Sequence, residues 1–259
     1  MAAMSSGFLG KAKQFPIRAA RSAAARTGNE DRMQELEAVF RKGSRRALRD
    51  DLITEGLLPA ILRGDSSAID VGANVGDVLR QITHLAPAGD HIAYEPVPHL
   101  ARELARRFPQ VDVRNAALAE QAGESTFTHV IDAPAFSGLR QRDDLPPAEV
   151  EEIKVEVQRL DDALPKRFEP ALIKIDVEGA EVLVLKGARE TLAKHKPALL
   201  FEHGLHGADL YGSTSNELWD IVDESGMRIF DLEGNGPFSR QQFAELFTEL
   251  TWNYLAVRK

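Results

Sequence analysis

The stretch LIKIDVEGAE, residues 172–181, places three carboxylates directly after a short apolar run. A carboxylate at a strand end can accept a proton or contact a ligand. It can also cap the following helix or stabilise its first turn through the helix dipole. Asp176 stands immediately at the strand end, so we interpret it as functional. Glu178 fits either role, and Glu181, one step further into the helix, is interpreted as structural.

A second group of candidate side chains lies in FEHGLHG, residues 201–207. It contains Glu202, His203 and His206, again after an apolar run. Histidine has the pKa best suited to a proton acceptor near neutral pH, which favours His203. The remaining histidines are interpreted as surface or structural residues. These are His84, His91, His99, His129 and His195.

The stretch AIDVGANVGD, residues 68–77, has the form of a strand, a glycine-containing turn and a helix start. Gly72 and Gly76 allow a sharp turn and a close approach to a ligand, and Asn74 tolerates the dihedrals of such turns. The spacing is G-x-x-x-G and lacks the middle glycine of a dinucleotide loop. Asp70 would repel a phosphate and attract a cation, which suits the ammonium and sulfonium of a methionine moiety.

Two further strand ends complete the predicted cofactor site. Glu95 closes the next strand and could accept the hydroxyls of a ribose. Asn115 and Ala116 follow the third strand, where an adenine ring could lie against small side chains and backbone. These residues also have a plain interpretation as ordinary turns, but the glycines, the two acids and the order of the strands together favour a nucleoside site.

From residue 64 onward, short apolar runs alternate with segments of helical periodicity, which indicates an α/β fold. The predicted main strands are 66–72, 91–96, 111–118, 171–177, 197–203, 227–232 and 251–257, with a short extra strand at 125–131. Such alternation predicts a doubly wound, mostly parallel sheet with helices on both faces. Ligands of such sheets bind at the carboxyl ends of the strands.

Residues 1–63 form a different segment. Residues 1–49 hold 11 basic and 4 acidic residues, whereas residues 50–259 hold 21 and 36. We expect a basic N-terminal arm followed by a helical lead-in at 31–62, broken near Gly43 and Gly56. A targeting segment, or a surface for anionic lipid or nucleic acid, is an alternative for the arm. The acidic body argues against nucleic-acid binding by the domain at 64–259.

Composition sets outer limits on function. The chain has 259 residues, 43% hydrophobic and 28% charged, as in ordinary globular proteins. No apolar run approaches the roughly 18 residues that span a bilayer. The chain has no cysteine, which excludes disulfides, thiolate metal sites and cysteine nucleophiles. It fits a reducing compartment, and we expect a cytoplasmic protein, with a homo-oligomer as one possible assembly.

The motifs DVGANVG (70–76), Glu95-Pro96, NAAL (115–118) and KIDVEGAE (174–181) together resemble the FkbM-type methyltransferases of the S-adenosylmethionine-dependent class I fold. The resemblance covers about residues 64–259, including IFDLEG (229–234) and WNYLAV (252–257). It implies a seven-stranded sheet of order 3-2-1-4-5-7-6 with the last strand antiparallel. It also implies S-adenosylmethionine as cofactor and methyl transfer to oxygen, often on sugars or secondary metabolites.

We therefore predict an O-methyltransferase acting on a small hydroxyl acceptor, of sugar or polyketide type. An alcohol needs a base during such a transfer, and His203 is the predicted base, with Asp176 and Glu178 as the other catalytic residues. Asp176, Glu178 and Glu202 could alternatively bind Mg²⁺, but their spacing is not diagnostic, and a metal is not the favoured prediction. The other hypotheses are a nicotinamide-dependent oxidoreductase and a non-catalytic S-adenosylmethionine-binding module.

The polar stretch 136–153 predicts a mobile lid, because connections of this length are commonly functional. Ser137 and Arg140 resemble the Ser-containing segment that lies near the cofactor in the family. Gly138 stands where a second serine is often found. Residues 207–217 are a second candidate wall of the acceptor site.

The predicted cofactor contacts are therefore spread over several turns: Asp70, Gly72, Asn74, Gly76, Glu95, Asn115, Ala116, Ser137 and Asp176.

Overall fold

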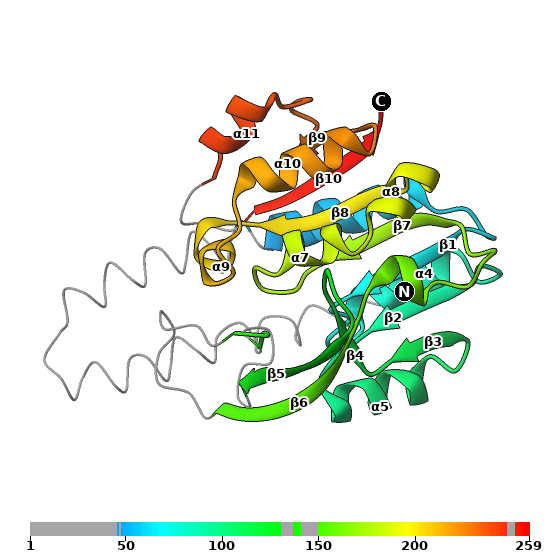
Figure 1. The fold of residues 1–259 in the computed structure, drawn as a ribbon. Helices are drawn as coiled ribbons and strands as arrows, with labels where there is room; N and C mark the ends of the chain where they lie inside the picture. Colours follow the sequence, from blue (N-terminus) through cyan, green and yellow to red (C-terminus); the bar gives the residue numbers. More distant parts are fainter. Residues whose placement is uncertain (1–45, 47, 131–136, 141–149, 248–251) are drawn as a thin grey trace, which may run out of the picture.

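A computed structural model describes residues 46, 48–130, 137–140, 150–247 and 252–259. Its centre is a seven-stranded sheet (Figure 1). The strands of this sheet are β1 (Ser67–Val71), β2 (His91–Tyr94), β3 (Val111–Arg114), β7 (Pro170–Ile175), β8 (Ala198–His203), β9 (Met227–Asp231) and β10 (Trp252–Arg258). Each begins and ends within a few residues of the predicted strand.

The order across the sheet is β3-β2-β1-β7-β8-β10-β9. Counted within this sheet alone, that is 3-2-1-4-5-7-6; the labels run higher because three strands of a second sheet intervene along the chain. The pairings from β3 through β8 are parallel, and β10 is antiparallel to both β8 and β9. The predicted fold class and the antiparallel last strand are confirmed.

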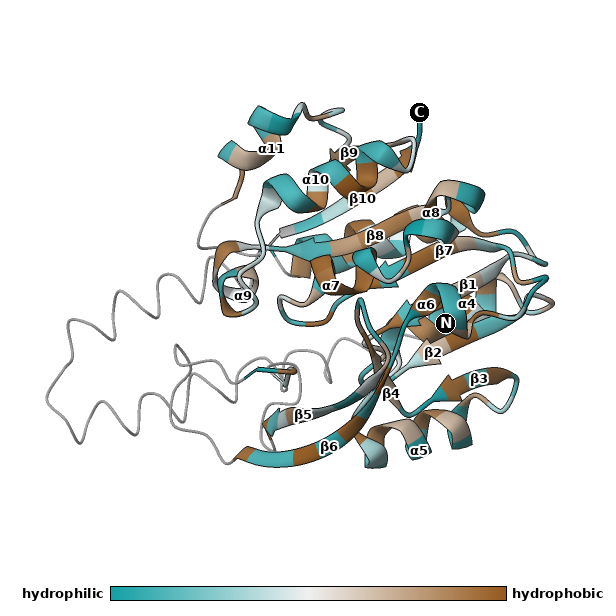
Figure 2. Cartoon of the chain, in the orientation of Figure 1, coloured by the Kyte–Doolittle hydropathy of each residue, from teal (hydrophilic) through white to brown (hydrophobic). Residues whose placement is uncertain are grey.

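Helices cover both faces of the main sheet. They are α4 (Asp77–Leu85), α5 (Pro98–Arg107), α6 (Leu160–Ala163), α7 (Glu181–Lys186), α8 (Arg189–His195), α9 (Leu205–Leu210), α10 (Ser215–Glu224) and α11 (Arg240–Glu245). Successive strand residues point to opposite faces. Ile173 and Ile175 therefore pack with α7, α8 and α10, whereas Leu172 packs with Ile82 of α4. Figure 2 shows hydrophobic residues on the central strands and α7, with hydrophilic residues on outer turns of α10 and α11.

The described part of the N-terminal lead-in is one helix over residues 48–61. It continues through Gly56, so the predicted break there is wrong; no side chain lies within reach of that glycine, and nothing forces a turn. Leu58 and Leu62 are buried against β1 and β7 residues. Arg46 pairs with the buried Asp50 at 2.9 Å and with Glu233 at 3.2 Å, which ties this segment to the turn after β9. The rest of the predicted arm lies outside the described residues.

A second, three-stranded sheet was not predicted. Its order is β4-β6-β5, formed by β4 (Ala116–Leu118), β5 (Gly123–Val130) and β6 (Val150–Gln158). In Figure 1, β5 and β6 form a long ribbon below the main sheet. Residues 150–153, predicted as part of the lid, are therefore strand. Residues 131–136 and 141–149 of that region lie outside the described residues.

The strand β6 was missed because charged residues are interspersed among its apolar ones, so it does not form a continuous apolar run. Val155 and Val157 are buried, and the residues before and between them are exposed or half-buried. A ribbon with one face against the protein needs only every second side chain to be apolar. None of the helices in the described ranges is long and apolar enough to cross a membrane.

Candidate active site

A pocket lies at the carboxyl ends of β1, β2 and β7 and beside β4. It encloses about 700 Å³, including the space at its open mouth. Its lining is Val71, Gly72, Asn74, Tyr94, Glu95, Pro96, Val97, Leu100, Ala116, Ala117, Leu118, Phe127, Ser137, Leu139, Asp176, Val177, Glu178 and Ala180. Seven of the predicted site residues are in this set: Gly72, Asn74, Glu95, Ala116, Ser137, Asp176 and Glu178. Asp70, Gly76, Asn115 and His203 are not.

The turn after β1 forms one wall of the pocket. Gly72 has φ 79°, and a Cβ at this position would clash with the backbone carbonyl oxygen of Asp176. The turn is therefore pressed against the end of β7, and only glycine fits. Asn74 also lies in the left-handed region, with φ 48°. Gly76 begins α4 and packs against Leu104 and Phe108, so its role is in packing rather than in ligand contact.

Glu95 joins the first two strand ends. Its Oε2 accepts a hydrogen bond from the Asn74 backbone N–H at 2.8 Å, and its Oε1 accepts one from Val97 at 2.9 Å. The side chain is buried, and burial raises its pKa despite these two backbone bonds, which lower it. Each carboxylate oxygen has a second lone pair, so Glu95 can still accept hydroxyls from a ligand in the pocket.

Asn115 has a structural role at the third strand end. Its Nδ2 donates to the carbonyl oxygens of Glu95 and Pro96 at 2.9 and 2.8 Å. These bonds fix the backbone that carries Glu95. The pocket wall itself is formed by the next residues, Ala116 to Leu118.

Asp70 faces another partner than the one predicted. It lies opposite Lys174 in the β1–β7 register, and Lys174 Nζ is 3.3 Å from its Oδ1. The same ammonium is 3.3 Å from Asp176 Oδ2 and donates to the Gly72 carbonyl at 3.0 Å. Burial would lower the pKa of Lys174, but the two carboxylates outweigh it and raise that pKa. The cation that Asp70 attracts is thus a lysine of this chain, and this pairing with Lys174 was not predicted.

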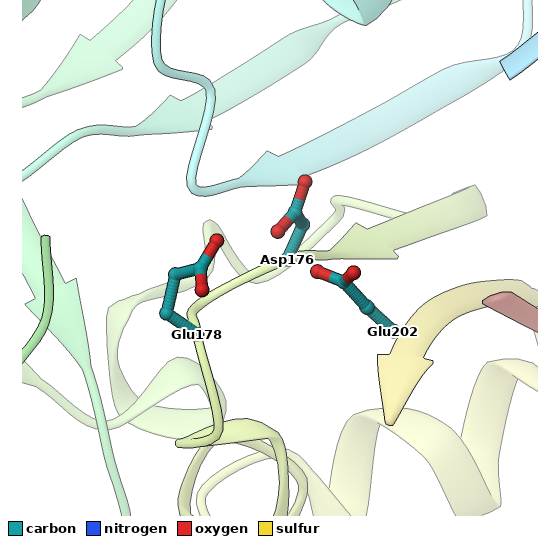
Figure 3. A group of neighbouring side chains, drawn as sticks. All are labelled: Asp176, Glu178 and Glu202. Carbon is teal, nitrogen blue, oxygen red and sulfur yellow. The ribbon is translucent and has the colours of Figure 1, made fainter. Parts of the chain in front are cut away.

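Three carboxylates converge at the edge of the pocket (Figure 3). Asp176 follows β7, Glu178 lies in the next turn, and Glu202 comes from the end of β8. One oxygen from each lies within 4.8 Å of the others. Burial, followed by the charges of Asp176 and Glu178, raises the pKa of Glu202 well above its ordinary value. The raised pKa makes Glu202 a better proton acceptor than an ordinary carboxylate. The three carboxylates together could also hold a divalent cation, because all their ligand atoms are oxygens.

His203 is not at the site. It is the residue after Glu202 on β8, so its side chain points to the other face of the sheet. There its ring stacks on Phe243 and Phe247, with ring centroids 5.9 and 4.9 Å apart. Burial lowers its pKa to about 4. The prediction of His203 as the base is therefore wrong, and Glu202 is the residue of that stretch that reaches the pocket edge.

Glu181 is buried under the turn between β7 and α7. It is 1% exposed, and its Oε1 accepts a hydrogen bond from the Gly179 backbone N–H at 3.0 Å. Burial raises its pKa to about 7. Gly179, with φ 104°, meets the backbone of Gly207 in α9, and a Cβ on Gly179 would clash with it. Glu181 therefore supports the turn that carries Glu178, which agrees with its predicted structural role.

The two predicted flanking segments meet each other. The Tyr211 hydroxyl accepts a hydrogen bond from the Arg140 backbone N–H at 3.1 Å, and Arg140 Nη1 donates to the Leu210 carbonyl at 2.7 Å. The segment 137–140 is thereby tied to the end of α9. The side chain of His206 lies outside the described residues.

The family model described as "Methyltransferase FkbM domain" matches residues 70–229, from Asp70 of β1 to Ile229 of β9. The chain belongs to the FkbM methyltransferase family. The matched range contains every strand end that forms the pocket. The resemblance seen in the sequence motifs is confirmed.

Two curated relatives of this FkbM methyltransferase are similar over part of their length. The AMB antimetabolite synthetase AmbE of Pseudomonas aeruginosa is 27% identical over 249 residues, which cover 76% of the chain and 12% of AmbE. The methyltransferase sdnD of Sordaria araneosa is 26% identical over 155 residues, covering 47% of the chain and 60% of sdnD. The chain thus spans less than two thirds of either relative.

Solved structures show the same kind of similarity. An FkbM methyltransferase from Methylobacillus flagellatus is 19% identical with a TM-score of 0.47, covering 76% of this chain and 44% of that one. The Streptococcus mutans protein SMU.1697c, solved in complex with SAH, is 11% identical with a TM-score of 0.43 and covers 81% and 98%.

The Lys174 ion pairs generate a stability prediction for the methyltransferase. Lys174→Met should lower the free energy of unfolding by about 3–5 kcal/mol, because it leaves the buried Asp70 without its cation. Lys186→Met is the control, since it removes a half-exposed pair with Glu217 and should cost less than about 1 kcal/mol. Urea unfolding measures both. Adding Asp70→Asn to Lys174→Met should recover part of the loss; equal losses in the two single variants would contradict this account.

The buried Glu181 generates a pH prediction. Its folded pKa of about 7 is above the ordinary value of 4.5, so the folded protein binds this proton more tightly than the unfolded chain does. Stability from this group is complete below about pH 4.5 and is lost as pH rises through 7. As pH rises from 4.5 to 8, the free energy of unfolding of Glu181→Gln should therefore increase by about 2–3 kcal/mol relative to that of wild type.

Urea unfolding across that pH range measures the gain. Glu217→Gln, which removes one carboxylate from the surface of α10, is the control for the loss of a charge. Parallel stability curves for wild type and Glu181→Gln would show that Glu181 does not hold a proton near neutral pH.

Proposed function

We propose that this methyltransferase uses S-adenosylmethionine and transfers its methyl group to a hydroxyl of a small sugar or secondary-metabolite acceptor. The observation that carries the proposal is the convergence of Asp176, Glu178 and Glu202 at the edge of the pocket formed by the ends of β1, β2 and β7.

The pocket has two chemically different halves, and each suits one part of S-adenosylmethionine. The purine would lie against apolar side chains contributed by α5 and its approach, by the second sheet and by segment 137–140: Val97, Leu100, Ala117, Leu118, Phe127 and Leu139. The ribose hydroxyls would bond to Glu95. The sulfonium would then lie near Gly72 and Asp176, where negative charge favours a cation.

Methyl transfer is an in-line displacement at the methyl carbon. The acceptor oxygen forms a bond to that carbon while the sulfur–carbon bond breaks, and its electron pair stays on sulfur as a neutral thioether. The acceptor proton must go to a base, and we assign that base to Glu202, with Asp176 and Glu178 orienting the hydroxyl. A raised pKa makes a carboxylate a stronger base near neutral pH, and a positioned base contributes about 10²–10⁴-fold.

The charge around the edge of the pocket limits the acceptor. Three carboxylates near one another would repel a phosphate or a carboxylate on the acceptor, so a neutral polyhydroxyl compound fits better. The similarity to AmbE, an antimetabolite synthetase by name, is consistent with a secondary-metabolite acceptor. Pyrophosphate would meet the same repulsion, which also disfavours the nicotinamide-dependent alternative.

Calorimetric titration tests the cofactor. S-adenosylhomocysteine should bind, and NAD should not. Glu95→Gln should weaken binding about 10- to 150-fold, the worth of about 1.5–3 kcal/mol for hydrogen bonds to a charged group. Glu103→Gln, on the exposed side of α5, is the matched control and should leave affinity unchanged. The proposal would be refuted if S-adenosylhomocysteine did not bind at about 1 mM, a concentration at which even a weakly bound cofactor is detected.

A second experiment tests the base. Methyl transfer from tritiated S-adenosylmethionine is measured with a panel of defined sugars and hydroxylated lactones, and with matched amines. Glu202→Gln should lower kcat about 10²–10⁴-fold while leaving the affinity for S-adenosylhomocysteine within about twofold. Glu217→Gln should behave like wild type.

The same assay separates the remaining alternatives. Transfer to amines alone would contradict the hydroxyl acceptor, and full activity of Glu202→Gln would contradict the assignment of the base. Binding of S-adenosylhomocysteine without methyl transfer to any acceptor would instead favour the binding-module hypothesis. An arm with EDTA is included because the three carboxylate oxygens could also hold Mg²⁺.

A further inference from the structure

His129 is a buried imidazole that the mechanism above does not use. It lies near the end of β5, is 4% exposed, and its Nδ1 is 3.2 Å from the hydroxyl oxygen of Ser137. Ser137 in turn lines the pocket, on the side formed by apolar residues. From the sequence, His129 is expected to be a surface or structural residue, and it lies near the pocket because an antiparallel bridge between Thr128 and Gly138 brings Ser137 beside it.

The hydrogen bonds of Ser137 limit what its hydroxyl can do. Its Oγ accepts the backbone N–H of Val130 at 2.9 Å, which occupies one of two lone pairs. The proton of the hydroxyl also needs an acceptor, and the one within hydrogen-bond distance among the described side chains is Nδ1 of His129. With that bond made, Ser137 keeps one lone pair and no proton for a ligand.

The surroundings of His129 keep it neutral near pH 7. Burial lowers its pKa, and the neighbouring His99, whose ring centroid is 5.3 Å away, lowers it further. Glu151, opposite His129 in the β5–β6 register, acts in the other direction but does not reverse the shift. A neutral ring can leave Nδ1 unprotonated and able to accept.

Purines differ in what they offer such an acceptor. Adenine carries a 6-amino group, which donates, whereas hypoxanthine carries a 6-oxo group, which accepts only. The half of the pocket around Ser137 is otherwise formed by Val97, Leu100, Ala117, Leu118, Phe127 and Leu139. A lone pair facing a 6-oxo group in such a setting would leave two acceptors opposed and unbonded, which is costly when water is excluded.

We propose that His129 is a positioning residue that turns the Ser137 hydroxyl so that its free lone pair faces the purine. His129 and Ser137 together then select a 6-amino over a 6-oxo base. The inference rests on the proposed use of S-adenosylmethionine. His129 does not touch the ligand; it acts through Ser137.

The test compares two probes by calorimetry, S-adenosylhomocysteine and its deaminated counterpart S-inosylhomocysteine. Wild type should prefer the adenine compound at least about tenfold, as expected for a site with a buried group left unpaired by the wrong ligand. Ser137→Ala and His129→Phe should both reduce the preference to about threefold or less, because each removes the oriented acceptor.

Two further variants separate positioning from general packing. His129→Asn places an amide oxygen near the position of Nδ1 and should restore most of the preference. His99→Asn changes the adjacent imidazole, which is not among the described hydrogen-bond partners of Ser137, and should leave the preference at the wild-type value. Because the readout is a ratio of two affinities for one protein sample, a general loss of stability does not move it. If His129→Phe does not fold, Ser137→Ala carries the test.

The outcomes distinguish the two proposals. No binding of S-adenosylhomocysteine would overturn the proposed function and this inference together. Tight binding of both probes by wild type, or an unchanged preference in Ser137→Ala, would overturn this inference alone and leave the cofactor assignment intact.

Discussion

The ammonium of Lys174, held between Asp70 and Asp176, is the interaction on which the site depends. It joins two adjacent parallel strands exactly where their carboxyl ends form the pocket, and it also bonds the Gly72 carbonyl of the cofactor turn. A buried carboxylate without a partner is strongly unfavourable. One ammonium therefore helps to fix both the register of β1 against β7 and the position of Asp176, and with two carboxylates to one ammonium this group keeps a net negative charge.

The alternation of side chains along a strand explains which residues of β8 reach the pocket. On β8, Glu202 points to the pocket edge and His203 to the aromatic residues on the other face. Burial, together with the negative charges of Asp176 and Glu178, raises the pKa of Glu202. A carboxylate of raised proton affinity thus lies where the proposed reaction needs a proton acceptor, which links the architecture of the sheet to the proposed chemistry.

Much of this could be predicted from the sequence, because the main strands are continuous apolar runs and their ends carry distinctive turns. Gly72, Asn74, Glu95 and Asp176 follow from that pattern, and the structure places all four in the pocket lining. The sequence suggested a ligand as the partner of Asp70. Its actual partner, Lys174, lies more than a hundred positions away along the chain, and only the strand register brings the two side by side.

The other differences have similar causes. The ordinary pKa of histidine suits a base near neutral pH, and this favoured His203 over Glu202, although strand alternation alone puts the two on opposite faces. The second sheet was missed although the extra strand predicted at 125–131 corresponds to β5, because its partner β6 is largely exposed and rich in charged residues and β4 continues the stretch predicted as the third strand. His129 and Ser137 are brought together by an antiparallel bridge between Thr128 and Gly138, and the sequence shows no alternation or turn pattern that would have predicted it.

The contact between Gly179 and Gly207 has a consequence for how members of such a family could diversify. Two chain segments from opposite sides of the carboxylate cluster touch backbone to backbone, without space for even a methyl group between them. Point substitutions at this junction cannot reshape the acceptor side, since any side chain would separate the segments. New acceptor specificity would have to be acquired elsewhere around the pocket, at lining residues that belong neither to the main sheet nor to its ion pairs, so that both stay unchanged.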